Sequence, residues 1–143
     1  LSAQLHAAFA LSEIKQDAAA GERLASAIET LPLHLKRIAA RLLTEVDLSK
    51  IKGLEPRLTK MLSHEDVYVR LYAARALMAQ GKSDAATVLA NEVQKKTPFI
   101  RDEVLDIIER TPAQHRDPVI MGWMTQPNPH LNRSLKRILK KSR

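Results

Sequence analysis

The chain is organised around the stretch Asp66-Val67-Tyr68-Val69-Arg70-Leu71-Tyr72-Ala73-Ala74-Arg75-Ala76-Leu77. Related stretches begin at Leu35, at Ile100 and, with weaker identity, at Leu131. They recur with a period of about 31–34 residues, which is the sequence signature of a stack of repeated supersecondary units. We therefore predict an all-α protein, an α-solenoid in which antiparallel helix hairpins stack into a superhelix.

The composition favours packed helices over sheets. Apolar residues make up 45% of the 143 residues, mainly as Ala and Leu, while aromatic residues make up only 3%. Closely packed helices suit such a set, whereas sheets favour aromatic and β-branched residues. We find no linker long enough to divide the chain, so residues 1–143 are predicted to form a single domain. Because the chain begins with Leu rather than Met, we interpret it as a fragment or processed part of a longer protein.

Two kinds of protein are disfavoured by what the sequence lacks. No cysteine occurs, which excludes disulfides and thiolate metal sites. No apolar run approaches the roughly 20 residues that span a bilayer, so no membrane insertion is expected. We therefore expect a cytoplasmic protein.

The spacing of apolar residues predicts nine helices, or four and a half hairpins. They are expected at about 3–16, 22–31, 33–46, 54–62, 67–80, 84–96, 98–110, 116–125 and 129–141. Several boundaries carry local signals. Asp66 is placed to cap the helix that follows it, and Gly81 is placed to end that helix. Thr97 and Asn128 each precede a proline at the first helical position.

Two further boundaries are predicted from the same kind of signal. Ser83 or Asp84 is expected to cap the helix at 84–96. Prolines at 112, 118 and 127 are expected to delimit the shorter helix at 116–125.

The organising stretch resembles the HEAT-repeat family, and more particularly its short bacterial HEAT-like form of the PBS-lyase type. That family places an acidic residue in the turn, then Val-Arg, a pair of alanines, Ala-Leu and a glycine. The matching residues here are Asp66, Val69, Arg70, Ala73, Ala74, Ala76, Leu77 and Gly81. The match is strong in residues 54–96, fair in 33–46 and 98–109, and faint at both ends.

A cation recurs in the first turn of three of the expected helices, at Lys36, Arg70 and Arg101. The helix dipole disfavours a cation at this place. We therefore expect a ladder of ion pairs to acids such as Asp66 or Asp102. The resemblance implies that this arginine is largely structural.

The resemblance also implies that the second helix of each hairpin lines a concave surface. There, the helices at 33–46 and 67–80 are basic or neutral, the one at 98–110 is acidic, and the last is basic again. This acidic interruption argues against a continuous track for nucleic acid. A mixed aromatic and basic patch, as favoured at protein-binding hot spots, is predicted instead. Its residues are Arg37, Arg41, Tyr68, Tyr72 and Arg75. The alternative is that they are solvated helix faces and packing residues.

The net charge of +7 is concentrated at the C-terminal end. Residues 130–143 hold six basic and no acidic residues, which leaves the rest of the chain close to neutral. The candidates for contact with phosphate are Arg133, Lys136, Arg137, Lys140 and Lys141. The alternative function is a nucleic-acid-binding module that resembles the HEAT-like DNA glycosylases. It would bind through these C-terminal residues and the arginines of the concave surface.

We find no catalytic constellation: no glycine-rich phosphate loop, no nucleophile elbow and no His-Glu-x-x-His motif. His64-Glu65 is similar to the paired motifs that bind iron in HEAT-like hydroxylases, but the pair occurs once and is expected to be a capping turn. Trp123, with Met121 and Met124, is read as core packing, with a partner-binding patch as the alternative. No enzyme activity, cofactor or metal is therefore expected. The leading hypothesis is a non-enzymatic scaffold for a protein or peptide, and another alternative is an ancillary solenoid domain of a larger enzyme.

Overall fold

A computed structural model describes residues 30–44, 54–95, 97–126 and 128–141, with backbone alone at 40–44, and every regular element in these ranges is an α-helix. The helices are α3 (Leu33–Thr44), α4 (Leu54–Met61), α5 (Val67–Ala79), α6 (Ser83–Val93), α7 (Pro98–Arg110), α8 (Ala113–Trp123) and α9 (Pro129–Lys140). The all-α prediction is confirmed. Of the nine helices expected, the one at 3–16 and nearly all of the one at 22–31 lie outside the described residues.

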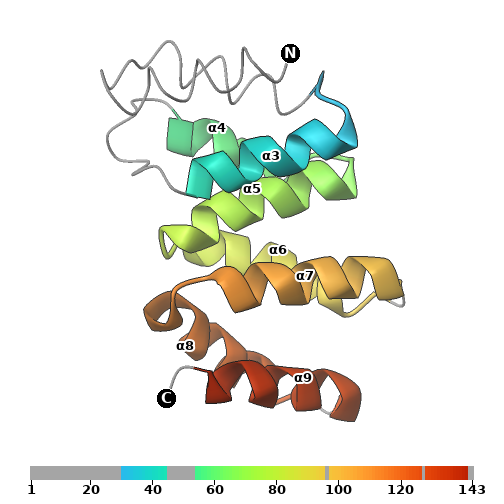
Figure 1. Cartoon of the computed structure of the whole chain (residues 1–143), viewed down its shortest axis with the longest axis vertical. Coiled ribbons are helices and arrows are strands. Elements are labelled where there is room, and N and C mark those ends of the chain that lie inside the picture. The colour runs from blue at the N-terminus through green and yellow to red at the C-terminus, as the bar shows by residue number, and fades with distance from the viewer. Residues whose placement is uncertain (1–29, 45–53, 96, 127, 142–143) are drawn as a thin grey trace.

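Most of the helices lie across the long axis of the molecule, with α3 and α4 at one end, α5 next to them, and α6 to α9 following toward the C-terminus (Figure 1). α5 is the central element, because it packs against α3, α4 and α6 and also touches α7 and α8. At the C-terminal end, α9 packs against α8 and α7. Neighbouring helices therefore share one continuous core.

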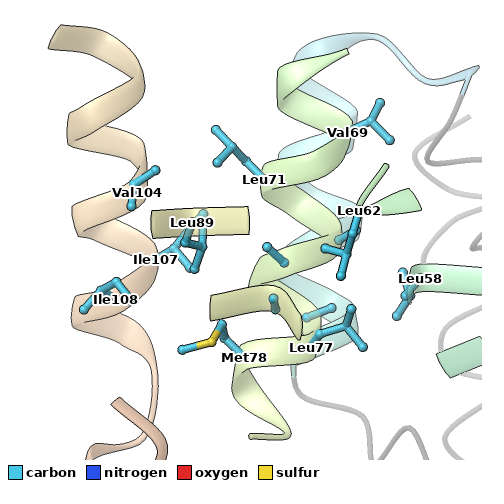
Figure 2. Packing of buried hydrophobic residues seen from close by; sticks show 14 of the residues in the cluster. Leu58, Leu62, Val69, Leu71, Leu77, Met78, Leu89, Val104, Ile107 and Ile108 are labelled. Carbon is cyan, nitrogen blue, oxygen red and sulfur yellow. The ribbon is translucent and has the colours of Figure 1, made fainter. Parts of the chain in front are cut away.

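That core is richest around α5, which is buried on nearly every side. Its buried residues are Val69, Leu71, Tyr72, Ala73, Ala74, Ala76, Leu77 and Met78. A helix that is apolar all round is typical of a position enclosed by other helices. Figure 2 shows Leu71 and Met78 on the side toward Val104 and Ile107 of α7, with Leu77 on the side toward Leu58 of α4.

The ends of α5 follow the signals in the sequence. The Asp66 side chain accepts a hydrogen bond from the backbone N–H of Tyr68 at 2.8 Å, so the predicted N-cap is confirmed. Gly81 adopts a φ of 75° directly after the helix, which is the left-handed conformation that ends many helices. Asn128 likewise caps α9, accepting from the N–H of Leu131 at 3.1 Å.

Two predicted boundaries were wrong. The N-cap position of α6 is Lys82 rather than Ser83 or Asp84, because the turn at Gly81 returns the chain directly into the next helix. Its backbone N–H donates to the carbonyl of Leu77 at 3.1 Å, which closes that turn.

The helix predicted at 116–125 is α8, which begins at Ala113 and contains Pro118. Its first turn closes on the carbonyl of Pro112, which accepts from the N–H groups of His115 and Arg116, each at 2.9 Å. Pro118 follows this first turn and is exposed. It has no backbone N–H to donate within the helix, but α8 continues past it to Trp123.

Gly81 supplies the first testable prediction. A Cβ at this position would lie 2.5 Å from Nδ1 of His115 and would also be strained by the positive φ. Gly81→Ala should therefore lower the free energy of unfolding by about 1–3 kcal/mol, measured by urea denaturation.

Gly122→Ala is the matched control, because it lies within α8 and a Cβ there would meet nothing within 4 Å. That change should raise stability by about 0.5–1 kcal/mol, the difference between Gly and Ala inside a helix. Equal effects of the two substitutions would contradict this account of the turn. Repeating Gly81→Ala with His115→Ala separates the collision from the backbone strain.

Candidate protein-binding site

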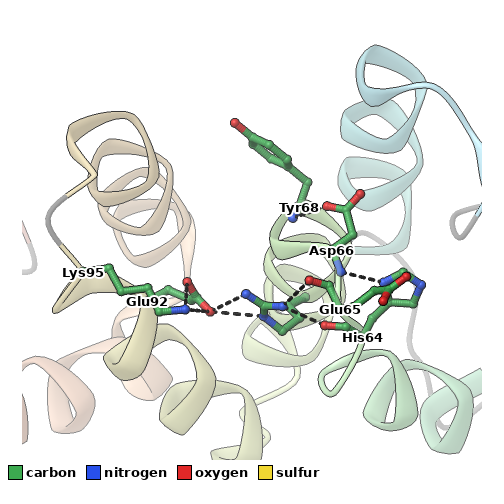
Figure 3. Close-up of polar contacts among 7 residues, drawn as sticks. His64, Glu65, Asp66, Tyr68, Glu92 and Lys95 are labelled. Carbon is green, nitrogen blue, oxygen red and sulfur yellow. Dashed lines mark hydrogen bonds and ion pairs between the residues drawn. The ribbon is translucent and has the colours of Figure 1, made fainter.

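The turn before α5 is held by a buried ion pair that reaches across to α6 (Figure 3). The guanidinium of Arg70 donates to Oε1 of Glu92 from Nε at 3.1 Å and from its terminal nitrogen at 2.8 Å. Its other terminal nitrogen donates to the backbone carbonyls of His64 at 2.7 Å and Glu65 at 2.9 Å. Glu92 is only 4% exposed and also pairs with Lys95 at 3.0 Å. Arg70 thus fixes the position of the turn relative to α6.

The predicted ladder of cations is confirmed at one repeat and differs at the others. Nζ of Lys36 lies 3.7 Å from Oδ2 of Asp66, as expected. Arg70 pairs with Glu92 and with neither Asp66 nor Asp102, because the α6 carboxylate lies directly opposite its guanidinium. At Arg101, Nε is buried without a hydrogen-bond partner among the described residues.

These contacts also favour the ionised form of the two carboxyls. Burial alone would raise the pKa of Asp66, but the N–H of Tyr68 and the charge of Lys36 hold that pKa below its usual value. Burial likewise opposes ionisation of Glu92, but hydrogen bonds from Lys95 and Arg70 lower its pKa. Both carboxylates therefore serve the fold as charged groups at neutral pH.

Beyond the first turn of α5, one cluster joins three helices. Nε of Arg37 on α3 donates to the hydroxyl of Tyr72 on α5 at 2.9 Å, and its guanidinium also forms an ion pair with Glu103 on α7. The same guanidinium lies over the ring of Phe99, 5.9 Å from its centroid. Tyr68 completes the group, with its ring centroid 6.3 Å from that of Tyr72 and 6.1 Å from that of Phe99. We call these five residues the aromatic–arginine cluster.

The cluster joins α3 and α7 across α5. Packed helices lie about 8–10 Å apart, so helices on either side of α5 are separated by roughly twice that distance. The long side chains of Arg37 and Glu103 bridge that separation with their ion pair. α3, α5 and α7 therefore contribute side chains to one shared face.

Only part of the cluster is open to solvent. Phe99 is 51% exposed and the Arg37 side chain 46%, whereas Tyr72 is 1% exposed and supplies mainly its hydroxyl to Arg37. Tyr68 is half-buried between them. The solvent-exposed part of the cluster therefore consists mainly of the Phe99 ring and the Arg37 side chain, with part of Tyr68.

The local electrostatics keep this arrangement in one protonation state. Burial raises the pKa of the Tyr72 hydroxyl, against the opposing hydrogen bond from Arg37. That hydrogen bond, with the charge of Glu103, raises the pKa of the Arg37 guanidinium. At neutral pH the cluster therefore holds a neutral tyrosine and a permanently charged arginine.

The structure brings together three of the five residues predicted for a binding patch, Arg37, Tyr68 and Tyr72. The side chain of Arg41 lies outside the described residues. Arg75 lies about two turns beyond Tyr68 on α5, where it lines a small cavity of about 40 Å³ with Ala79, Ile107, Arg110 and Thr111.

Phe99 and Glu103 were missed by the sequence reading. The repeat contains the signal that would have found them, because Phe99 aligns with Tyr68 and Glu103 with Tyr72 at the offset that relates α7 to α5. The two helices place these residues at equivalent positions on the same face.

The other candidate residues lie elsewhere. Arg133, Lys136, Arg137, Lys140 and Lys141 are all exposed on or just after α9. His64 accepts a hydrogen bond from the N–H of Asp66 at 3.0 Å and belongs to the turn. Trp123 and Met124 pack partly against the core, as predicted, while Met121 is 65% exposed.

Within the ranges the structure describes, no group of three or more His, Asp or Glu side chains is placed to hold a metal ion. None of the helices α3–α9 combines the length and apolarity needed to cross a bilayer. Comparison with protein-family models, with curated proteins and with solved structures gave no match.

Removing Arg70 tests the buried ion pair. Arg70→Met leaves the Glu92 carboxylate buried with Lys95 as its remaining cation, so the free energy of unfolding should fall by about 3 kcal/mol. Arg110→Met is the control, because its pair with Asp106 at 3.1 Å is between side chains that are 60% and 46% exposed. Such a surface pair should contribute less than about 1 kcal/mol. Similar losses in urea denaturation for the two variants would refute the structural role of Arg70.

The burial of Tyr72 can be tested by titration. In Tyr68→Phe, Tyr72 is the only tyrosine, and its absorbance at alkaline pH reports its ionisation directly. Because the folded protein favours the neutral hydroxyl, the stability that it contributes is fully present below the unfolded pKa of about 10. That stability is lost as the pH rises through the higher folded-state pKa. The midpoint should therefore lie higher in the folded variant than in the same variant in urea, and equal midpoints would contradict the buried position.

Proposed function

We propose that this chain is a non-enzymatic scaffold, a short HEAT-like α-solenoid that binds a protein or peptide segment on the concave face of α3, α5 and α7. The solenoid assignment is supported by the recurring stretch, by the Asp66 cap and by the stacking of neighbouring helices along one axis. An ancillary domain of a larger enzyme would use the same face to hold a neighbouring domain.

The observation that carries this proposal is the exposed part of the aromatic–arginine cluster. Aromatic residues and arginine are enriched at the few positions that dominate protein-binding energy. Phe99 is 51% exposed although it contacts two other side chains of the cluster, Tyr68 and Arg37. A ring held in this way offers apolar area to a partner without much further loss of conformational freedom.

The fixed position of Arg37 adds to that argument. Its side chain is held by Tyr72, Glu103 and Phe99 at once, so the usual entropic cost of ordering an arginine at an interface has already been met within the fold. The concave face that a solenoid implies would favour a narrow occupant, such as a helix or an extended segment of another protein.

A photocrosslinking amino acid placed at position 99 tests the proposal in cells that contain the natural partners. We expect discrete adducts at position 99 and none at position 121, because Met121 is more exposed but lies outside the cluster on α8. Adducts that are the same at both positions would indicate non-specific contact.

The partner identified in this way should then be titrated against Phe99→Ala. A hot-spot residue costs about 2 kcal/mol or more when truncated, which corresponds to a loss of affinity of roughly 30-fold. The melting temperature should be nearly unchanged, since half of the side chain is already in solvent. Wild-type affinity in Phe99→Ala would overturn the assignment of this face.

A further inference from the structure

α9 carries a second surface, distinct from the concave face. Its apolar residues Leu131, Leu135 and Ile138 are each at most 1% exposed, and Asn128 caps its first turn. The helix is therefore fixed firmly to the fold. Its exposed basic residues lie at spacings of three and four, so they form one stripe along the outer side. We call Arg133, Lys136, Arg137 and Lys140 the basic stripe.

The basic stripe occupies positions that serve packing elsewhere in the repeat. On α5 the aligned positions of Arg133, Lys136 and Lys140 are Leu71, Ala74 and Met78, all of which are buried. α9 presents charge where α5 presents apolar side chains to its neighbours. This surface is therefore built to face water or a charged partner, and not another helix of the same kind.

Solubility alone would not require charge of a single sign. A surface that only needs to stay in solution mixes acids with bases, but α9 contains no acidic residue. Like charges three and four residues apart also destabilise a helix. Lys141 is paired with Glu109, whose charge also acts on Arg137, but among the described residues no ion pair holds Arg133, Lys136 or Lys140. The fold therefore maintains a row of four cations with a single acid near one of them, at an energetic cost.

The surroundings of the basic stripe limit the class of anionic partner that it can bind. Membrane binding by an amphipathic helix requires its apolar face, which here is buried within the protein. Proteins that bind single-stranded nucleic acid usually stack bases on aromatic rings, and α9 has none. The stripe spans about 10 Å along the helix, which matches the axial rise of about three base pairs of a duplex.

We propose that the basic stripe of α9 binds the sugar-phosphate backbone of duplex nucleic acid without reading its sequence. Arg133, Lys136, Arg137 and Lys140 each contact phosphate oxygens. This site is independent of the scaffold proposed for the concave face, and either can exist without the other.

The test is fluorescence anisotropy with two unrelated 24-base-pair DNA duplexes between about 20 and 200 mM NaCl. Both duplexes should bind alike, and the logarithm of the association constant should fall with the logarithm of salt with a slope of about −3 to −4, as expected for four phosphate contacts. Absence of binding at the lowest salt overturns the proposal, and so does a strong preference for one sequence.

Two double variants locate the site. Lys136→Gln with Lys140→Gln should reduce the magnitude of the salt slope by about 2, because two phosphate contacts are lost. Lys60→Gln with Lys82→Gln makes the same change in net charge at exposed positions outside α9 and should leave the slope unchanged. Equal effects of the two double variants would show that only net charge matters, which overturns a site on α9.

Two competitors identify the class of anion. Polyglutamate and vesicles containing phosphatidylserine should displace the duplex only when their charge concentration greatly exceeds that of the DNA phosphates. If either competes at equal or lower charge concentration, the stripe is an acidic-protein or membrane site and the assignment to nucleic acid is wrong.

Discussion

The burial of α5 on nearly every side is the constraint on which the rest of the structure depends. A helix that touches α3, α4, α6, α7 and α8 cannot carry many polar groups, and its middle is accordingly built from alanine and large apolar residues. Small residues at 73, 74 and 76 let the neighbouring helices approach closely, while Leu71, Leu77 and Met78 fill the space between them. The side chains of α5 that carry polar atoms are therefore few: Tyr68, Arg70, Tyr72 and Arg75.

Around the first turn of α5, some polar positions stabilise the fold and another lies on the surface. Asp66 caps the helix and Arg70 is used by the buried pair with Glu92, so both serve the fold. Tyr68 lies between them in sequence and contacts the ring of Phe99 on α7. The equivalent position on α7 is Phe99, so the repeat brings these two rings to the same side, whereas α3 contributes Arg37, which aligns with Leu71.

The sequence was sufficient for those features that depend on local chemistry or on the repeat. The cap at Asp66, the left-handed Gly81 and the pair between Lys36 and Asp66 all follow from residue type and spacing. What could not be predicted depends on contacts between helices. Arg70 pairs with Glu92 because the packing of α6 places that carboxylate opposite its guanidinium. The hydroxyl of Tyr72 accepts a hydrogen bond from Arg37 because α3 packs against α5.

The acidic residues of α7 were interpreted from the sequence as an interruption of a basic surface, but in the structure they form ion pairs. Glu103 pairs with Arg37 from α3, Asp106 with Arg110 on α7 itself, and Glu109 with Lys141 after α9. The hydrogen bond from Lys141 lowers the pKa of Glu109, as expected for a carboxylate held in its charged form. Glu103 and Glu109 are therefore counterions for cations outside α7, and Asp106 is a counterion within α7. Because these acids form their ion pairs with cations outside the basic stripe, the net positive charge of the protein is concentrated on α9.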